Sequence, residues 1–209
     1  MVRKDLDNFL LTIPKDITIV AATKYVGADD MLELYRHGVN NFGENRVDSF
    51  LKKYEALSSY QNIKWHFIGH LQRNKAKLVV NKIDCLHSLD SFALAEIINK
   101  YRDKPLDVFI EVSINLEENK NGVPYYEVKE FINSIKGFSN INIVGLMMMA
   151  IKNSDDVQLQ FAKLRELRDE LEKECQIKLP CLSMGMSDDY EAAIKEKTTH
   201  IRLGRILYL

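Results

Sequence analysis

Short apolar runs alternate with amphipathic segments along the whole chain. The first run, 17–23, is short and rich in β-branched residues, which indicates a buried strand. Between the runs, apolar positions recur at the spacing of a helix with one buried face. The predicted strands are 17–23, 39–42, 64–68, 83–87, 107–112, 141–146, 179–184 and 200–203. The predicted helices are 29–37, 46–57, 72–80, one capped by Asp90, one from Pro124 to Gly137, a long one capped by Ser154 and a short one from about Asp188.

Eight strands with a helical segment in nearly every gap predict a parallel sheet. A closed barrel and an open doubly wound sheet both satisfy this order. Eight strand–helix repeats favour the barrel, and the first strand lacks the G-x-G-x-x-G turn of a dinucleotide-binding sheet. We therefore predict an α/β fold in which residues 1–209 form one (β/α)8 TIM-type barrel domain, with short loops and no second domain.

Composition narrows the class of protein. The chain is 46% apolar and 28% charged with a net charge of −1, so no global field attracts nucleic acid or an anionic membrane. The basic pair Lys52 and Lys53 is interpreted as a solvated helix face. Three isolated cysteines fit a reducing cytosol. The N-terminal segment is charged, and the sequence has no long apolar run. Together with the cysteines, these features predict a cytoplasmic protein.

In barrels of this kind the reactive site lies at the C-terminal ends of the strands, and phosphate groups bind after strands seven and eight. The first predicted strand ends at Lys24, the seventh leads into Gly185 and Ser187, and the eighth leads into Gly204. Closure of the barrel brings the eighth strand beside the first. A lysine next to a phosphate site suggests Schiff-base chemistry. The competing interpretations are a solvated loop lysine and a simple strand-to-helix turn with Ser187 as helix cap.

Arg202 lies inside the last predicted strand. If Ile201 and Leu203 face the helices, the alternation of a strand turns Arg202 into the barrel, where a charge needs a partner.

Six strings of the sequence together resemble the pyridoxal phosphate homeostasis protein family, which is related to the N-terminal domain of alanine racemase. They are AATKY (21–25), FGENRV (42–47), WHFIGHLQRNK (65–75), GLMMMA (145–150), LSMGMSDDYEAAI (182–194) and IRLG (201–204). The resemblance covers nearly the whole chain. It implies a fold type III barrel that binds pyridoxal 5′-phosphate and lacks the C-terminal β domain of the racemases.

The resemblance also assigns residues. It implies that Lys24 forms a Schiff base with the cofactor aldehyde and that Asn45 lies near the cofactor. Ser187, Gly204 and Arg205 would hold the phosphate, and Arg202 would face the pyridine nitrogen. Relatives often have threonine where this chain has Arg205, so its phosphate contact can use the backbone amide, the guanidinium or both.

An arginine at the pyridine nitrogen accepts no proton, which predicts a weak electron sink. Tyr25 is the sole, weak candidate for a second base beside Lys24. We therefore expect a protein that stores, protects and delivers the cofactor in transient contact with cofactor-requiring apo-enzymes, rather than an enzyme. An amino-acid racemase or lyase of narrow scope and a cofactor-free Schiff-base aldolase are the alternatives. A monomer is expected, because the domain that completes shared racemase sites is missing.

The remaining candidates are less specific. His66, His70, Cys85 and His87 lack a metal-ligand spacing, so core or rim packing is favoured and no metal is predicted. Lys120, after the fifth predicted strand, is a candidate second docking point for the aldehyde, against a solvated loop lysine.

Overall fold

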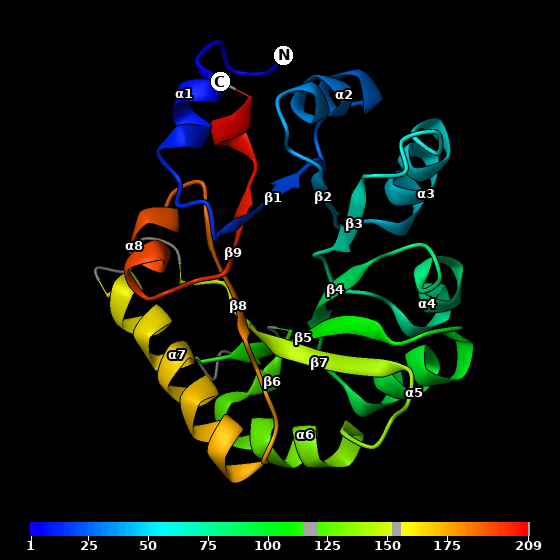
Figure 1. Ribbon diagram of the computed structural model, residues 1–209. Helices are drawn as coiled ribbons and strands as arrows, with labels where there is room; N and C mark the ends of the chain where they lie inside the picture. Colours follow the sequence, from blue (N-terminus) through cyan, green and yellow to red (C-terminus); the bar gives the residue numbers. More distant parts are fainter. Residues whose placement is uncertain (115–120, 152–155, 209) are drawn as a thin grey trace.

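The computed structural model describes residues 1–114, 121–151 and 156–208, and its strands form one parallel sheet that closes into a barrel (Figure 1). Adjacent strands of the barrel are, in ring order, β1 (Thr18–Ala22), β2 (Asn41–Glu44), β3 (Lys64–Phe67), β4 (Cys85–Leu89), β5 (Leu106–Ser113), β7 (Ile141–Met147), β8 (Cys181–Met186) and β9 (His200–Leu203). β9 pairs with β1, and the pairing of β4 with β5 closes the ring. The (β/α)8 prediction is confirmed.

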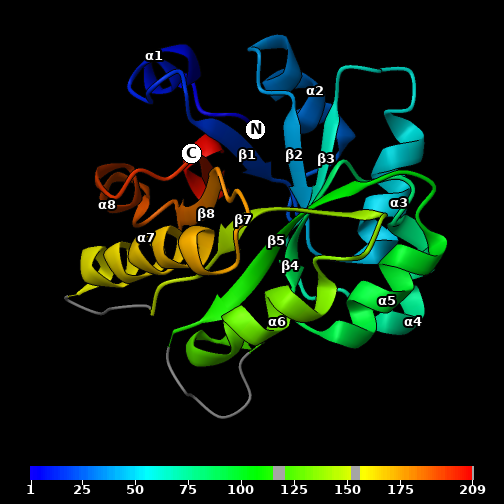
Figure 2. The ribbon, with the colours of Figure 1, turned by 60° about the horizontal axis from the view of Figure 1, so that its bottom comes forward.

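Helices surround the barrel (Figures 1 and 2). They are α1 (Leu6–Leu11), α2 (Ala28–Arg36), α3 (Val47–Ala56), α4 (Arg73–Val79), α5 (Phe92–Tyr101), α6 (Val128–Ile135), α7 (Val157–Glu174) and α8 (Tyr190–Lys195), with the 3-10 turns η1 (Tyr125–Glu127) and η2 (Arg205–Leu207). Their apolar faces and the outer faces of the strands make up two large buried clusters. No helix of the described residues is both long and apolar enough to cross a membrane.

The helix starts differ from the prediction in two places. Pro124 does not begin a helix: with Val123 it forms the two-residue strand β6, which pairs with the end of β5, and α6 begins at Val128 after η1. Proline fits this edge position because it has no N–H to donate. Ser91 rather than Asp90 is the N-cap of α5, since the Asp90 carboxylate contacts His70 instead.

Two further points concern helix boundaries. The cap predicted at Ser154 lies outside the described residues, and Asp156 precedes the first residue of α7. The N-terminal helix α1 was not predicted. It buries Leu6 and Phe9, and the Arg3 amide donates to the Leu207 carbonyl, so the two ends of the described chain lie together.

Gly145 determines how closely two strands approach. A Cβ built there would lie 1.8 Å from the carbonyl oxygen of Cys181, on the neighbouring strand β8. Only glycine therefore permits the observed spacing of β7 and β8.

Candidate functional site

Lys24 lies two residues after the end of β1, at the C-terminal end of the barrel strands. Its side chain is exposed, and its Nζ lies 4.9 Å from the centre of the Tyr25 ring. Tyr25 is 83% exposed, so the aromatic ring provides a contact for the ammonium without burying it. The amine is thus accessible to a ligand.

The backbone before Lys24 is held by a buried polar cluster of three side chains. Glu44 Oε1 accepts hydrogen bonds from Thr23 Oγ1 and from Lys53 Nζ, both at 2.5 Å. Lys53 Nζ also donates to the Thr23 carbonyl at 2.6 Å. The Lys53 side chain is only 12% exposed, so its interpretation as a solvated helix residue was wrong. It neutralises the fully buried Glu44 and fixes the end of β1.

The predicted phosphate site contains converging backbone amides. The N–H groups of Gly204 and Ile206 point at Ser187 Oγ, at 3.2 and 3.5 Å. A Cβ built on Gly204 would meet only Ala22, at 3.7 Å, so there is open space above this backbone. Because β9 pairs with β1, Gly204 lies beside Ala22, two residues before Lys24. Backbone N–H groups that converge in this way favour an anion.

Gly185 has a φ of +96°, which lets β8 turn sharply toward α8. A Cβ there would lie 2.7 Å from the Ala193 Cβ, so the close approach of α8 also requires glycine. Gly185 thus places Ser187 against the Gly204 backbone.

The Arg205 guanidinium contacts Asp188 on the surface rather than Ser187. Its Nη2 donates to both carboxylate oxygens of Asp188, at 2.7 and 2.6 Å, and both side chains are more than 70% exposed. Of the two phosphate contacts considered for Arg205, this arrangement favours the backbone amide.

Arg202 lies inside the barrel, as strand alternation predicted. Its Nη1 donates to the carbonyl and to the hydroxyl of Ser183, and its Nη2 donates to the Met148 carbonyl. The side chain is 5% exposed and forms no ion pair with a described carboxylate. Burial lowers the Arg202 pKa to about 10, so the guanidinium remains charged at neutral pH.

Asn45 lies in the turn after β2. Its Cβ and carbonyl oxygen would both be 2.6 Å from a Cβ on Gly69, at the end of β3. Gly69 of the WHFIG string therefore allows the Asn45 turn to pack closely at the mouth of the barrel. The structure places Asn45 at the same end as Lys24 and Gly204, because each follows the end of a parallel strand.

Sequence reasoning missed Glu111 on β5. This carboxyl is 5% exposed, and burial together with the charge of Asp90 raises its pKa to about 7, although Arg202 acts in the opposite direction. A buried glutamate within the DVFIEV run was the only signal available in the sequence. Groups with such pKa values are frequent in functional sites.

His66, Cys85 and His87 lie inside the barrel with ligand-type atoms within 4.8 Å of one another. The ring nitrogens of the two histidines are already engaged: they contact each other at 2.9 Å, and the outer nitrogens contact Asn41 and Ser183. His70, by contrast, is exposed and pairs with Asp90 at 3.0 Å. Lys120 lies outside the described residues.

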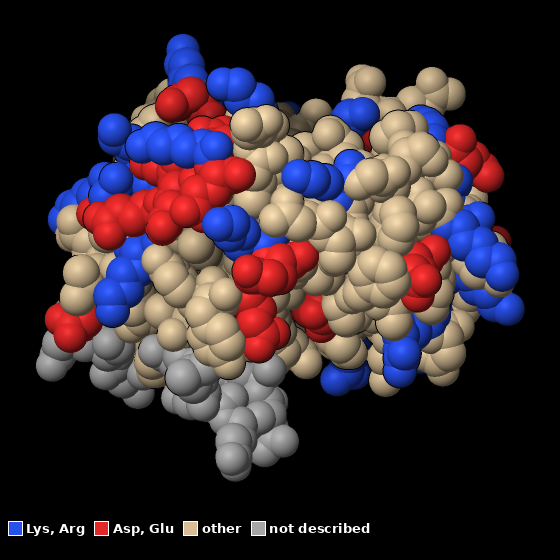
Figure 3. All heavy atoms as spheres, turned by 90° about the horizontal axis from the view of Figure 1, so that it is seen from below, with Lys and Arg blue, Asp and Glu red and all other residues tan. Residues whose placement is uncertain are grey.

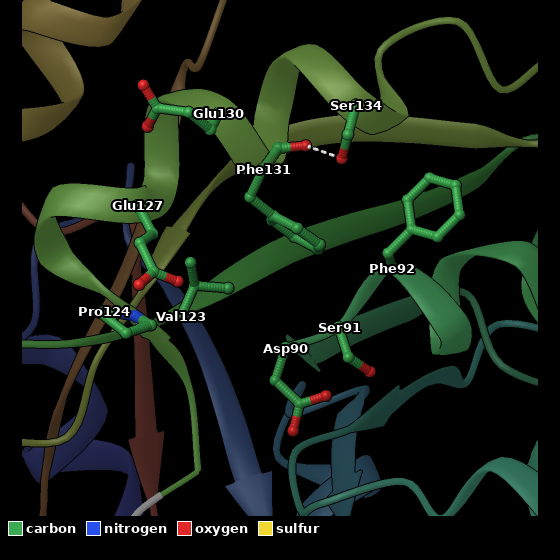
Figure 4. A pocket seen from close by; sticks show the side chains of 9 residues that line it. All are labelled: Asp90, Ser91, Phe92, Val123, Pro124, Glu127, Glu130, Phe131 and Ser134. Atoms are coloured by element: carbon green, nitrogen blue, oxygen red, sulfur yellow. Dashed lines mark hydrogen bonds between the residues drawn. The ribbon is translucent and has the colours of Figure 1, made fainter.

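Two cavities share the lining residues Asp90 and Ser91. One of about 470 Å³ lies between the start of α5 and the segment of β6, η1 and α6, and its lining residues include Asp90, Glu127 and Phe131 (Figure 4). The other, of about 940 Å³, is lined by residues from His70 to Asn74 and by Asp90, Ser91, Ala93, Asn121 and Gly122. Neither is lined by Lys24, Ser187 or Arg202.

The barrel and its amide-lined mouth define the class of protein: the family described as alanine racemase, N-terminal domain, matches residues 11–209. Curated relatives match over nearly the whole chain. The pyridoxal phosphate homeostasis protein of Aquifex aeolicus is 44% identical over 195 residues, covering 91% of this chain and 85% of the relative. That of Synechocystis sp. is 36% identical over 207 residues, covering 96% and 94%. This chain belongs to the pyridoxal phosphate homeostasis protein family.

Solved structures agree with this assignment. PipY of Synechococcus elongatus, in a structure described as having PLP bound, has a TM-score of 0.90 at 29% identity and covers 98% of this chain and 100% of its own. The alanine racemase of Corynebacterium glutamicum has a TM-score of 0.76 at 14% identity, covering 97% of this chain and 58% of the racemase, which demonstrates the shared barrel alone.

Proposed function

We propose that this protein binds pyridoxal 5′-phosphate at the open end of the barrel and acts in the homeostasis of that cofactor. The observation that carries the proposal is the pair of Gly204 and Ile206 amides that converge at Ser187, beside the end of β1, which lies two residues before Lys24. These groups fit a phosphate next to a reactive aldehyde. The names of the relatives, and the PLP recorded in the PipY structure, support the same cofactor.

Each residue of this site has a separate task in the proposal. Ser187 and the Gly204 and Arg205 backbone hold the phosphate, and the Lys24 amine is the covalent anchor for the aldehyde. Asn45 lies beside the cofactor. Arg202 faces the pyridine nitrogen, with an Nε–H that has no partner among the described residues. When bound, the cofactor supplies an electron sink. A neighbouring cation that gives up no proton weakens this electron sink.

We further propose that the protein stores, protects and delivers the cofactor without turnover. Arg202 at the pyridine nitrogen supports a carrier more than an enzyme. Delivery requires transient contact with cofactor-requiring apo-enzymes, and we propose a cytoplasmic monomer formed by residues 1–209 as one domain. Nucleic acid and membranes are not among the proposed partners: basic and acidic side chains are interspersed on the face in Figure 3, and the net charge is −1.

A racemase or lyase of narrow scope is the second candidate function, and Glu111 is the observation in its favour. A carboxyl with a pKa of about 7 near Arg202 is suited to proton transfer at neutral pH. Amino-acid turnover by the purified protein, lost on Glu111→Gln, would replace the carrier proposal with this one. A cofactor-free aldolase instead requires a colourless protein that traps a carbonyl substrate on Lys24 under borohydride.

The experiment for the proposed function is a visible absorption spectrum after addition of pyridoxal phosphate, followed by borohydride reduction and peptide mass spectrometry. We expect a new visible band and a phosphopyridoxyl mass on Lys24, with loss of both in Lys24→Ala. Lys15→Ala removes another exposed lysine and serves as the control. A native protein without the band and without the modified peptide would refute the cofactor proposal.

A further inference from the structure

A continuous chain of hydrogen bonds crosses the interior of the barrel below Arg202. Arg202 Nη1 lies 2.6 Å from Ser183 Oγ, which lies 2.8 Å from His87 Nδ1. His87 Nε2 lies 2.9 Å from His66 Nδ1, and His66 Nε2 lies 3.0 Å from Asn41 Oδ1. The five residues come from β9, β8, β4, β3 and β2, and the contact between His87 and Ser183 spans the barrel.

The two ends of this chain fix its direction. A guanidinium only donates hydrogen bonds, so Ser183 Oγ accepts from Arg202. At the other end, the Asn41 amide group donates through Nδ2 to Asn40 Oδ1 at 2.9 Å, which turns Asn41 Oδ1 toward His66. Because that oxygen only accepts, His66 must carry its proton on Nε2.

The protonation state of the histidines completes the assignment. Burial lowers the pKa of His66 to about 3 and that of His87 well below its usual value, so each ring carries one N–H at neutral pH. With its proton on Nε2, His66 accepts at Nδ1 from His87 Nε2–H. His87 then accepts at Nδ1 from the Ser183 hydroxyl. Every hydrogen bond thus points away from Arg202 toward Asn41.

This polarity has an electrostatic consequence. An aligned series of donors presents its negative ends to Arg202, and such dipoles in a low-dielectric interior stabilise a cation without an ion pair. A metal ion among His66, Cys85 and His87 would have to displace the hydrogen bond between the two rings. The complete pairing of both rings favours the hydrogen-bonded chain.

We propose that Ser183, His87 and His66 are positioning residues: they hold the Arg202 guanidinium in place, stabilise its charge and so determine how it meets the pyridine ring. The part that concerns the ring rests on the proposed function. The chain of hydrogen bonds itself belongs to the cofactor-free protein and is tested there.

The first test is the tautomer of each ring, measured by long-range ¹H–¹⁵N NMR on the cofactor-free protein at neutral pH. We expect protonated Nε2 and unprotonated Nδ1 in both His66 and His87. A proton on Nδ1 of either ring would overturn the proposal, because the direction of the chain would break at that residue. This result is independent of cofactor binding.

The second test compares His87→Gln with His87→Leu in binding of pyridoxal phosphate. Glutamine retains an acceptor for Ser183 and a donor for His66, whereas leucine removes both. We expect His87→Leu to weaken binding by up to about tenfold, the upper end of the effect of losing one neutral hydrogen bond, and His87→Gln to restore most of it. If His87→Leu does not fold, Ser183→Ala breaks the same chain with a smaller side chain.

The outcomes separate the two proposals. Equal binding by the native protein, His87→Leu and Ser183→Ala would overturn the positioning role. A native protein that binds no pyridoxal phosphate would overturn the proposed function, while the tautomers would still decide whether the chain exists.

Discussion

Glu111→Gln isolates the energetic effect of one buried carboxyl on folding. Glu111 is 5% exposed, and its pKa is raised from 4.5 to about 7, chiefly by burial. A raised pKa means that the folded state binds the proton more tightly than the unfolded chain does. The stabilisation of the folded state by the protonated Glu111 carboxyl is therefore fully present below pH 4.5 and is lost as the pH rises through about 7.

The magnitude follows from the two pKa values. Between pH 5 and pH 8, this linkage destabilises the native protein by about 2.5 kcal/mol through Glu111 alone, at about 1.4 kcal/mol per pKa unit. Glutamine has nearly the same shape and does not titrate. We therefore expect the free energy of unfolding of Glu111→Gln, relative to the native protein, to increase by about 2.5 kcal/mol over this range.

Urea unfolding at several pH values, followed by fluorescence of the buried Trp65, measures this difference. Trp65 is the single tryptophan of the chain. The buried histidines titrate in both proteins, so their contribution cancels in the difference. Glu55→Gln, at an exposed position, is the control. A difference between Glu111→Gln and the native protein that stays constant from pH 5 to pH 8 would refute the assignment of a raised pKa.

Two other substitutions test the framework of the site. Gly145→Ala places a Cβ 1.8 Å from the Cys181 carbonyl oxygen, so we expect a loss of about 3 kcal/mol in unfolding free energy as β7 and β8 separate. Gly137→Ala has no atom within 4 Å of its Cβ and is the control in the same denaturation assay; equal losses would contradict the argument. Lys53→Met leaves Glu44 buried without its cation, and we expect a loss of about 3 kcal/mol. The double variant Glu44→Gln/Lys53→Met should recover part of it, and a double variant as unstable as the single one would disprove the ion-pair explanation.

The strands were predictable as short, largely buried runs, and β1, β5 and β7 are in addition rich in β-branched residues. The predicted 200–203 matches β9, and the predicted 141–146 differs from β7 by one residue. Helix starts were less predictable, as at Pro124 and Asp90. No helix of the described residues has a side-chain hydrogen bond at its N-cap, so the usual sequence signal for a helix start carries little weight here.

The candidate site was predictable only where it depends on strand order. Parallel strands of a barrel end at one mouth, so Lys24, Asn45, Ser187 and Gly204 had to lie at the same end. The contacts inside the barrel depend on the register between strands, which periodicity does not fix. His87 meets Ser183 across 96 positions of sequence, and the partner of Lys53 is visible only once the helix α3 packs over β2.

Arg202 shows both cases in one residue. Its position inside the barrel was predictable from the sequence, whereas its hydrogen-bond partners were not. A buried cation is ordinarily expected to pair with a carboxylate. The carboxyls whose charges act on Arg202 are Glu111 and Asp189, and burial raises the pKa of both. With Glu111 only partly ionised near neutral pH, part of the stabilisation must come from the neutral dipoles of Met148, Ser183 and the two histidines behind it. Arg202 then keeps its positive charge in the barrel interior without a tight carboxylate pair. A site of this kind attracts an anionic ligand before any specific contact forms, and a tight carboxylate pair at Arg202 would have cancelled that attraction.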